Sequence, residues 1–121
     1  MSLTILAVDD SRTMRDMIKQ ALTEFGFEVV VADDGIHGLE TLADCEPDVI
    51  ITDINMPRMD GFGFIEAVRA DETRRGVPIL TLTTESAPEL RQRARDAGAT
   101  GWIVKPFDKE KLAAVIRRVA A

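Results

Sequence analysis

The chain has 121 residues and a net charge of −6 at pH 7, with 45% hydrophobic residues, 30% charged residues and a single cysteine, Cys45. These values predict one globular domain over residues 1–121 that folds without disulfides or a structural metal, and they exclude a protein drawn as a whole to nucleic acid or anionic membranes. No apolar stretch is long enough to span a membrane and no signal peptide is apparent, so we expect a cytoplasmic protein.

Five short apolar segments, rich in β-branched residues, are expected to form buried strands. They lie at residues 3–8, 28–32, 48–52, 77–82 and 99–104. The third segment is the most hydrophobic, and it leads directly into Asp53 and a turn that contains Pro57 and Gly61. A carboxylate is therefore expected where a buried strand leaves its sheet.

A segment with apolar residues at three- and four-residue steps follows each strand, which predicts amphipathic helices. These helices are expected at residues 14–25, 36–43, 61–68, 87–97 and 112–119. Gly26 and Gly98 are expected to end the first and fourth helices, and Pro47 to close the second. The alternation predicts an α/β fold: a five-stranded parallel sheet of order 2-1-3-4-5 with helices on both faces, in the doubly wound, flavodoxin-like arrangement.

In such a sheet the carboxyl ends of all strands open on the same edge, where ligands bind. With this strand order, Asp9, Asp10, Asp53, Thr83 and Lys105 should converge there. Three neighbouring carboxylates repel one another unless a cation lies between them, and oxygen ligands of this kind favour Mg²⁺. Acidic ligands, a nucleophilic carboxylate, a lysine and a hydroxyl suit phosphoryl transfer to Asp53.

Each of these residues also has an ordinary structural explanation when it is taken alone. Asp10 or Ser11 can cap the first helix, Thr83 can cap the fourth, and Lys105 can be a surface lysine beside a proline. The functional interpretation depends on all of them falling at one edge of one sheet.

The chain resembles the receiver domain of two-component response regulators over essentially its whole length. Residues 8–15 resemble the family's first acidic motif in its chemotaxis form, and residues 53–61 resemble its phosphoacceptor motif. Thr83 and residues 105–107 stand where the family has its switch hydroxyl and its lysine. Within the family, the chain is most similar to the single-domain, CheY-like chemotaxis members.

This resemblance implies specific roles at the edge of the sheet. Asp53 would take a phosphoryl group from a phosphohistidine of a CheA-like histidine kinase and become an acyl phosphate. Asp10, Asp53 and the main-chain carbonyl of Asn55 would bind Mg²⁺, with Asp9 acting through water. Lys105 would pair with a phosphoryl oxygen, and its peptide bond to the following proline is expected to be cis.

The resemblance also implies a switch. Thr83 would move to hydrogen-bond the phosphoryl group, and Trp102 stands where the family usually has Tyr or Phe. Trp102 is either a switch residue that turns inward or an edge residue packed on the fourth helix. Asn55 and Glu85, two residues after Asp53 and Thr83, would position or block the hydrolytic water.

The resemblance implies a phosphorylation-switched binding module rather than an enzyme. The only reactions that it would catalyse are its own phosphorylation and its slow dephosphorylation. Its output face would comprise the fourth helix, fifth strand and fifth helix, and its target would be a flagellar motor switch protein (FliM-like) or another protein. We expect a monomer. Arg91, Arg93 and Arg95 form either a solvated face of the fourth helix or a contact for an acidic partner.

Three alternatives remain open at this point. The protein could be a phosphorelay shuttle or phosphate sink within the same family. It could be a Mg²⁺-dependent phosphohydrolase, although Asn55 stands where a second acid would be needed. It could also be a degenerate receiver that binds partners without phosphorylation, although the intact acidic pair, Asp53 and Lys105 argue against this.

Overall fold

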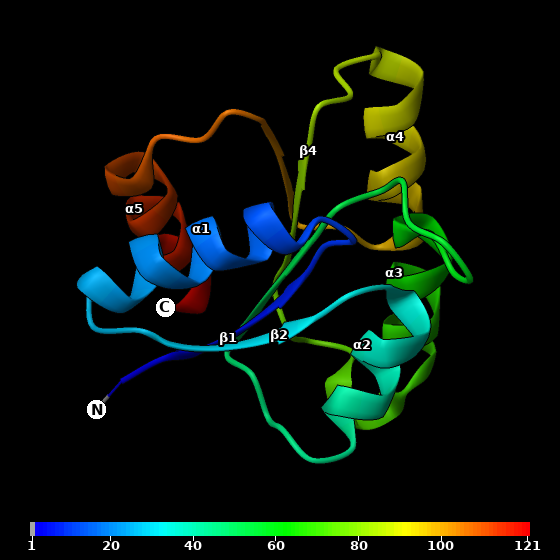
Figure 1. The fold of residues 1–121 in the computed structure, drawn as a ribbon. Helices are drawn as coiled ribbons and strands as arrows, with labels where there is room; N and C mark the ends of the chain where they lie inside the picture. Colours follow the sequence, from blue (N-terminus) through cyan, green and yellow to red (C-terminus); the bar gives the residue numbers. More distant parts are fainter. Residues whose placement is uncertain (1) are drawn as a thin grey trace.

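The structure is a computed structural model that describes residues 2–121, in which five strands alternate with five α-helices (Figure 1). The strands are β1 (Thr4–Val8), β2 (Glu28–Ala32), β3 (Val49–Thr52), β4 (Ile79–Thr83) and β5 (Gly101–Val104). The helices are α1 (Arg12–Glu24), α2 (Gly35–Leu42), α3 (Gly61–Ala70), α4 (Pro88–Ala97) and α5 (Lys109–Ala120), with a 3-10 turn, η1 (Glu72–Arg74), before β4. The strands pair in parallel in the order β2-β1-β3-β4-β5, which confirms the predicted fold class.

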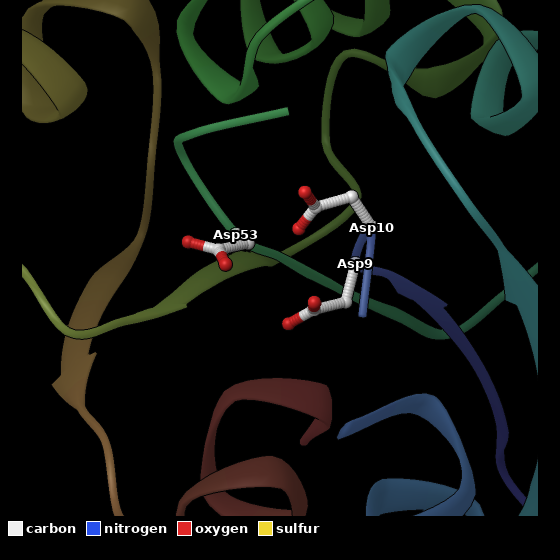
Figure 2. Close-up of side chains that lie close together, drawn as sticks. All are labelled: Asp9, Asp10 and Asp53. Atoms are coloured by element: carbon white, nitrogen blue, oxygen red, sulfur yellow. The ribbon is translucent and has the colours of Figure 1, made fainter. Parts of the chain in front are cut away.

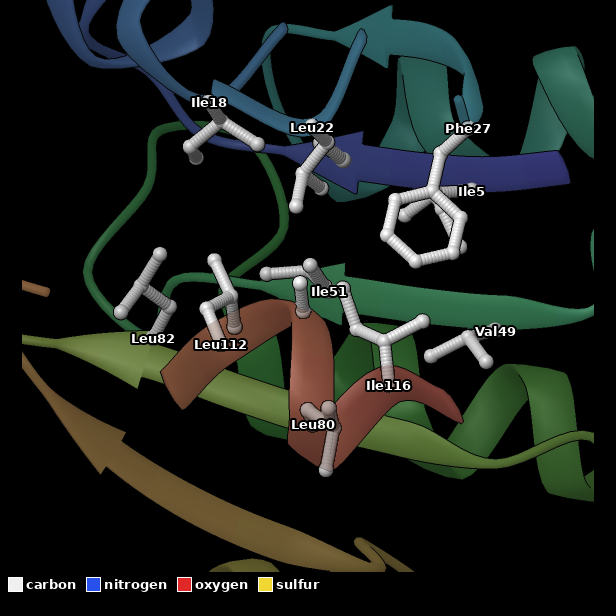
Figure 3. Packing of buried hydrophobic residues seen from close by; sticks show 12 residues of the cluster. Ile5, Ile18, Leu22, Phe27, Val49, Ile51, Leu80, Leu82, Leu112 and Ile116 are labelled. Carbon is white, nitrogen blue, oxygen red and sulfur yellow. The ribbon is translucent and has the colours of Figure 1, made fainter. Parts of the chain in front are cut away.

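The central strands are buried on both faces, because alternate side chains of a strand point to opposite sides of the sheet. Helices α1 and α5 lie over one face, and α2, α3 and α4 lie over the other (Figure 1). On the first face, Ile18 and Leu22 of α1 and Leu112 and Ile116 of α5 pack in one cluster with Ile51 of β3 (Figure 3). Burial on two faces explains why β1, β3 and β4 are nearly continuous apolar runs.

A second hydrophobic cluster fills the space between the other face of the sheet and α3. Leu6, Ile50 and Ile79, one from each central strand, pack in it with Phe64 and Ile65. All five side chains are fully buried. The sheet is thus held between two helical layers, and this fixes the positions of the loops that leave its carboxyl edge.

Most element ends lie within a few residues of those expected, and two of the differences have a clear physical reason. β4 continues through Thr83, which the sequence pattern placed just beyond its end, because the Lys105 N–H donates to the Thr83 carbonyl and extends the ladder. α2 ends at Leu42, so the prediction that Pro47 closes this helix was wrong. The guanidinium of Arg74 donates to the Leu42 carbonyl and satisfies one of the acceptors exposed at this helix end.

Side-chain caps start four of the five α-helices. Ser11 caps α1, Asp34 caps α2, Asp60 caps α3 and Asp108 caps α5, each by accepting a hydrogen bond from a backbone N–H of the first turn. Of the two residues expected to cap the first helix, Ser11 does so and Asp10 does not. No helix within residues 2–121 has both the length and the apolar character needed to cross a membrane.

Candidate functional site

Asp9 and Asp53 lie side by side at the carboxyl edge of the sheet, because β1 and β3 are neighbours and Val8 pairs in register with Thr52. Asp10 follows at once, and one carboxylate oxygen from each of the three aspartates lies within 4.8 Å of the others. Figure 2 shows the three carboxylates around a common space. The structure therefore brings together the acidic residues that the sequence pattern placed at this edge.

Lys105 follows the end of β5 and reaches into this acidic cluster. Its Nζ atom donates to Asp9 Oδ2 at 2.8 Å and to Asp53 Oδ2 at 2.9 Å. The peptide bond between Lys105 and Pro106 is cis, as predicted. The ammonium thus bridges two carboxylates that are almost completely buried, Asp9 being 1% exposed and Asp53 8% exposed.

Burial governs the electrostatics of this cluster. Burial raises the pKa of Asp9 above 3.8, because the hydrogen bonds and the positive charge that favour its ionised form compensate only in part. For Lys105, burial alone would lower the pKa, but the hydrogen bonds and charges of Asp9 and Asp53 outweigh it and raise the pKa above 10.5. One ammonium therefore faces three carboxylates, which leaves an excess of negative charge.

The donor atoms of the cluster fit a hard divalent cation. They are all carboxylate oxygens, the ligands that Mg²⁺ prefers over nitrogen or sulfur donors. Asp10 is exposed at the rim, so solvent reaches the space between the three side chains, and Mg²⁺ usually keeps several bound waters. A divalent cation would also offset the excess negative charge that a single lysine leaves.

The loops after β3 and β4 meet beside the cluster. Asn55 Nδ2 donates to Glu85 Oε1 at 3.2 Å, and the Glu85 N–H donates to Thr83 Oγ1 at 3.3 Å. The two positions expected to influence hydrolysis are therefore in direct contact, although they lie 30 residues apart in the sequence. The sequence pattern did not predict this contact, because it depends on the conformations of two loops.

Trp102 lies on β5 and is half buried. Its ring packs against the cluster of Ile54, Phe62 and Ala94, and its Nε1–H donates to the Glu85 carbonyl at 3.0 Å. The interpretation of Trp102 as an edge residue packed near α4 describes this arrangement. The same hydrogen bond also joins the indole to the loop that follows Thr83, so the arrangement is compatible with a switch role.

The three arginines of α4 do not share one environment. Arg93 stacks over the ring of Phe62, with its Cζ atom 4.0 Å from the ring centre. Arg91 and Arg95 line a shallow cavity of about 220 Å³ beside Trp102. A basic rim therefore surrounds part of the surface between α4 and β5.

One pair near the site was not expected from the sequence. Asp34, the N-cap residue of α2, accepts two hydrogen bonds from the guanidinium of Arg58, in the loop after Asp53. The sequence pattern indicated only a turn at residues 33–35. The local signals that remain are an acidic residue before Gly35 and an arginine between two methionines, and neither identifies its partner.

Known proteins are similar to this chain in sequence and in structure. Residues 5–117 match the response regulator receiver domain family. The chain is 42% identical to a protein named "Chemotaxis protein CheY" from Pseudomonas aeruginosa over 120 residues, which cover 95% of this chain and 97% of the relative. It therefore matches that relative over nearly the full length of both.

Solved structures give the same result. The chemotaxis response regulator CheY4 of Vibrio cholerae superposes with a TM-score of 0.92 at 45% identity, covering 98% of this chain and 99% of that one. The receiver domain of a sensor histidine kinase from Pseudomonas aeruginosa, solved with a magnesium ion coordinated in its active site cleft, superposes with a TM-score of 0.91 at 28% identity, covering 99% and 98%. The chain belongs to the response regulator receiver domain family of two-component systems, and its similarity within that family is to the chemotaxis proteins named CheY.

Proposed function

We propose that this chain is a single-domain, cytoplasmic response regulator, folded as one receiver domain over residues 1–121 and acting as a monomer. A CheA-like histidine kinase phosphorylates Asp53 in a Mg²⁺-dependent reaction, and the modification alters the surface formed by α4, β5 and α5. The observation that carries the proposal is the place of the Asp53 carboxylate, between one ammonium and two further carboxylates at the carboxyl edge. Similarity to chemotaxis proteins named CheY supports a role in chemotaxis.

In the proposed reaction, an Asp53 carboxylate oxygen attacks the phosphorus of a phosphohistidine on the kinase. An O–P bond forms, the N–P bond breaks, and its electron pair stays on the departing imidazole, which takes up a proton from solvent. Asp10, Asp53 and the main-chain carbonyl of Asn55 are the proposed Mg²⁺ ligands, with Asp9 acting through water. The metal would neutralise negative charge on the transferring phosphoryl group.

Lys105 and Thr83 would stabilise the product. Lys105 Nζ already lies 2.9 Å from Asp53 Oδ2, so a phosphoryl group on that carboxylate arrives beside a fixed positive charge. Thr83 is fully buried at the end of β4, the strand next to β3, and its hydroxyl would donate to another phosphoryl oxygen. Both groups act as hydrogen-bond donors, and neither has to give up a proton.

Movement of Thr83 offers a route from the site to the surface. The Thr83 hydroxyl accepts the Glu85 N–H, and the Glu85 carbonyl accepts the indole N–H of Trp102. Reorienting the Thr83 hydroxyl towards a phosphoryl group would shift the loop that contains Glu85 and alter the hydrogen bond between the Glu85 carbonyl and the indole of Trp102. We therefore assign Thr83 and Trp102 to the switch.

The lifetime of the acyl phosphate would depend on Asn55 and Glu85. Their hydrogen-bonded side chains stand at the mouth of the site, where a hydrolytic water must approach Asp53. Separating this pair would change access for that water and thus the rate of dephosphorylation.

The proposed target surface has the chemistry of a docking site. β5 is an edge strand with Val104 41% exposed, and α4 contributes Arg91 and Arg95 beside the half-buried Trp102. An exposed apolar side chain with a basic rim suits an acidic, amphipathic segment of a partner. We propose a flagellar motor switch protein (FliM-like) as that partner.

The first test is chemical labelling with acetyl phosphate and Mg²⁺. We expect one phosphoryl group per chain that hydroxylamine removes, as it does from acyl phosphates. It should be lost in Asp53→Asn and retained in Asp33→Asn, which removes an exposed carboxylate just after the edge strand β2. Labelling of Asp53→Asn would contradict the assignment. Repeated turnover of a phosphate ester by the wild type would favour a phosphohydrolase instead.

The second test concerns the target. Beryllofluoride with Mg²⁺ should increase binding to a motor-switch peptide, as measured by calorimetry, and Asp53→Asn should remove the increase. Equal binding with and without beryllofluoride would count against the motor target. If the phosphorylated chain instead passes its phosphoryl group back to a kinase, it acts as a shuttle or phosphate sink.

A further inference from the structure

The loop that follows Asp53 is tied to α2 by an ion pair between the exposed side chain of Arg58 and the buried carboxylate of Asp34. Asp34 is 4% exposed, and it accepts from Arg58 Nε at 2.6 Å and from Arg58 Nη2 at 3.0 Å. Its carboxylate also accepts the His37 N–H at 2.8 Å, so the same side chain caps α2. This pairing lowers the pKa of Asp34 and raises that of Arg58, each mainly through the hydrogen bonds between them.

The backbone of Arg58 adopts a conformation that its side chain disfavours. Its φ angle is +63°, in the left-handed region, and within residues 2–121 no other non-glycine residue has a positive φ. The Met59 N–H donates to the Pro57 carbonyl at 2.6 Å, which closes a three-residue γ-turn around Arg58. A strained turn of this kind persists only where its surroundings hold it in place, and strained residues cluster at functional sites.

Other contacts hold the same turn against α2. The Gly35 N–H donates to the Met59 carbonyl at 3.2 Å. A side chain at Gly35 would place a Cβ atom 2.8 Å from that carbonyl oxygen, so this close approach requires glycine. The start of α2 and the turn after Asp53 therefore form one rigid unit.

Asn55 lies inside this unit, between Asp53 and Arg58 in the sequence. Its side chain contacts Glu85 on the far side of the site, and Asn55 itself is exposed, so few packing contacts fix its backbone. At the other end of the loop, the Gly61 N–H donates to the Ile54 carbonyl at 2.8 Å. This hydrogen bond closes the loop that contains both Asn55 and the turn around Arg58.

We propose that Asp34 and Arg58 form a positioning pair for the metal site, because they fix the turn that aims the Asn55 carbonyl at the cation. This inference rests on the proposed function, which makes that carbonyl a Mg²⁺ ligand. Neither Asp34 nor Arg58 contacts the reacting groups. Their effect passes through the backbone of residues 55–58, as outer-shell groups commonly orient metal ligands.

The test uses the full chain and compares three variants. Asp34→Asn keeps a cap acceptor for α2 but removes the negative charge that Arg58 requires. Arg58→Gly removes the ion pair and lets the turn adopt φ = +63° without strain, so it separates positioning from folding. Asp71→Asn is the matched control, because Asp71 also caps a turn and also pairs with an arginine, Arg74, but at the opposite end of the sheet.

Mg²⁺ binding is measured by calorimetry, and thermal unfolding is measured without metal. We expect the dissociation constant for Mg²⁺ to rise about tenfold in both Asp34→Asn and Arg58→Gly and to stay unchanged in Asp71→Asn. The double variant should bind no more weakly than either single variant, since both remove one interaction. Phosphorylation by acetyl phosphate should slow at low Mg²⁺ and recover at saturating Mg²⁺.

Three outcomes would overturn the proposal. The first is unchanged Mg²⁺ affinity in both variants. The second is a drop in the melting temperature of Asp34→Asn with unchanged Mg²⁺ affinity in Arg58→Gly, which would leave the pair a purely structural role. The third is failure of the wild type to bind Mg²⁺, which would remove the proposed function itself and is distinguished by the wild-type titration alone.

Discussion

Asp9 shows that a residue required by the proposed reaction is unfavourable for the folded chain. Its carboxylate is 1% exposed, and burial raises its pKa even though Lys105 lies 2.8 Å away. The free-energy cost of removing the carboxylate charge from water exceeds the stabilisation that it gains from one ammonium shared with Asp53. A metal-free receiver therefore holds a strained cluster of charge that metal binding would relieve.

Replacing this carboxylate should stabilise the metal-free protein. We expect Asp9→Asn to raise its stability by about 1 kcal/mol, or roughly 4 °C in melting temperature. Loss of the buried charge should outweigh the loss of one of the two hydrogen bonds that the carboxylate accepts, from the Ser11 N–H and from Lys105 Nζ. Asp10→Asn is the control, since Asp10 is exposed and its replacement should change the metal-free melting temperature little. A lower melting temperature for Asp9→Asn than for the wild type would contradict this account.

The same substitution should show a defined pH dependence. A carboxyl whose folded pKa is raised above its unfolded value of about 3.8 binds more protons in the folded state, so its contribution to stability falls as pH rises through that window. The difference in stability between Asp9→Asn and the wild type should therefore grow from acidic to neutral pH. Denaturant unfolding at a series of pH values measures it, and a difference that shrinks with rising pH would refute the assignment to Asp9.

At the level of elements, the connection from β3 to α3 is set by a close approach at Gly61. A Cβ atom at this position would lie 2.2 Å from the Asp53 carbonyl oxygen and 2.8 Å from the Ile54 Cα. Both are backbone atoms of the segment that presents the acceptor carboxylate, so they cannot move without displacing it. Glycine here lets the first turn of α3 pack directly on the end of β3.

Gly61→Ala should therefore damage both stability and phosphorylation. We expect a loss of about 3 kcal/mol in the free energy of unfolding, together with slower labelling by acetyl phosphate, because the backbone at Asp53 must shift. Gly76→Ala is the control, since a Cβ atom at Gly76 would meet nothing within 4 Å. Wild-type stability in Gly61→Ala would show that the loop relaxes freely.

Features that depend on the local sequence pattern could be predicted from the sequence, whereas contacts that depend on loop conformation could not. Asp9 and Asp53 end apolar runs, so their places at strand ends followed from the pattern, and parallel topology then brought them together. Arg58 and Asp34 lie 24 residues apart and meet at a turn where Arg58 takes a backbone conformation that its side chain disfavours. No periodicity marks such a residue, and the contact between the Trp102 indole and the Glu85 carbonyl likewise depends on a loop.

For the molecule as a whole, metal binding and folding should be linked. A cation that binds only the folded chain stabilises it by about 2.7 kcal/mol at one hundred times its dissociation constant. We expect Mg²⁺ to raise the melting temperature, EDTA to reverse the rise, and Asp10→Asn to reduce it strongly. An equal rise in the wild type and in Asp10→Asn would indicate a general salt effect rather than binding at the acidic cluster.

Communication across the molecule can be followed with Trp102, the single tryptophan of the chain. Because its indole N–H is held by the Glu85 carbonyl and the Glu85 N–H is held by the Thr83 hydroxyl, addition of beryllofluoride and Mg²⁺ should change its emission. Thr83→Val keeps the approximate shape of the side chain but removes that hydroxyl, so it should bind beryllofluoride, as shown by its melting temperature, without the change in emission. Thr41→Val removes a hydroxyl that donates to the His37 carbonyl on α2, remote from β5, and it should respond as the wild type does. A full emission change in Thr83→Val would show that the signal reaches β5 by a route that bypasses the hydroxyl.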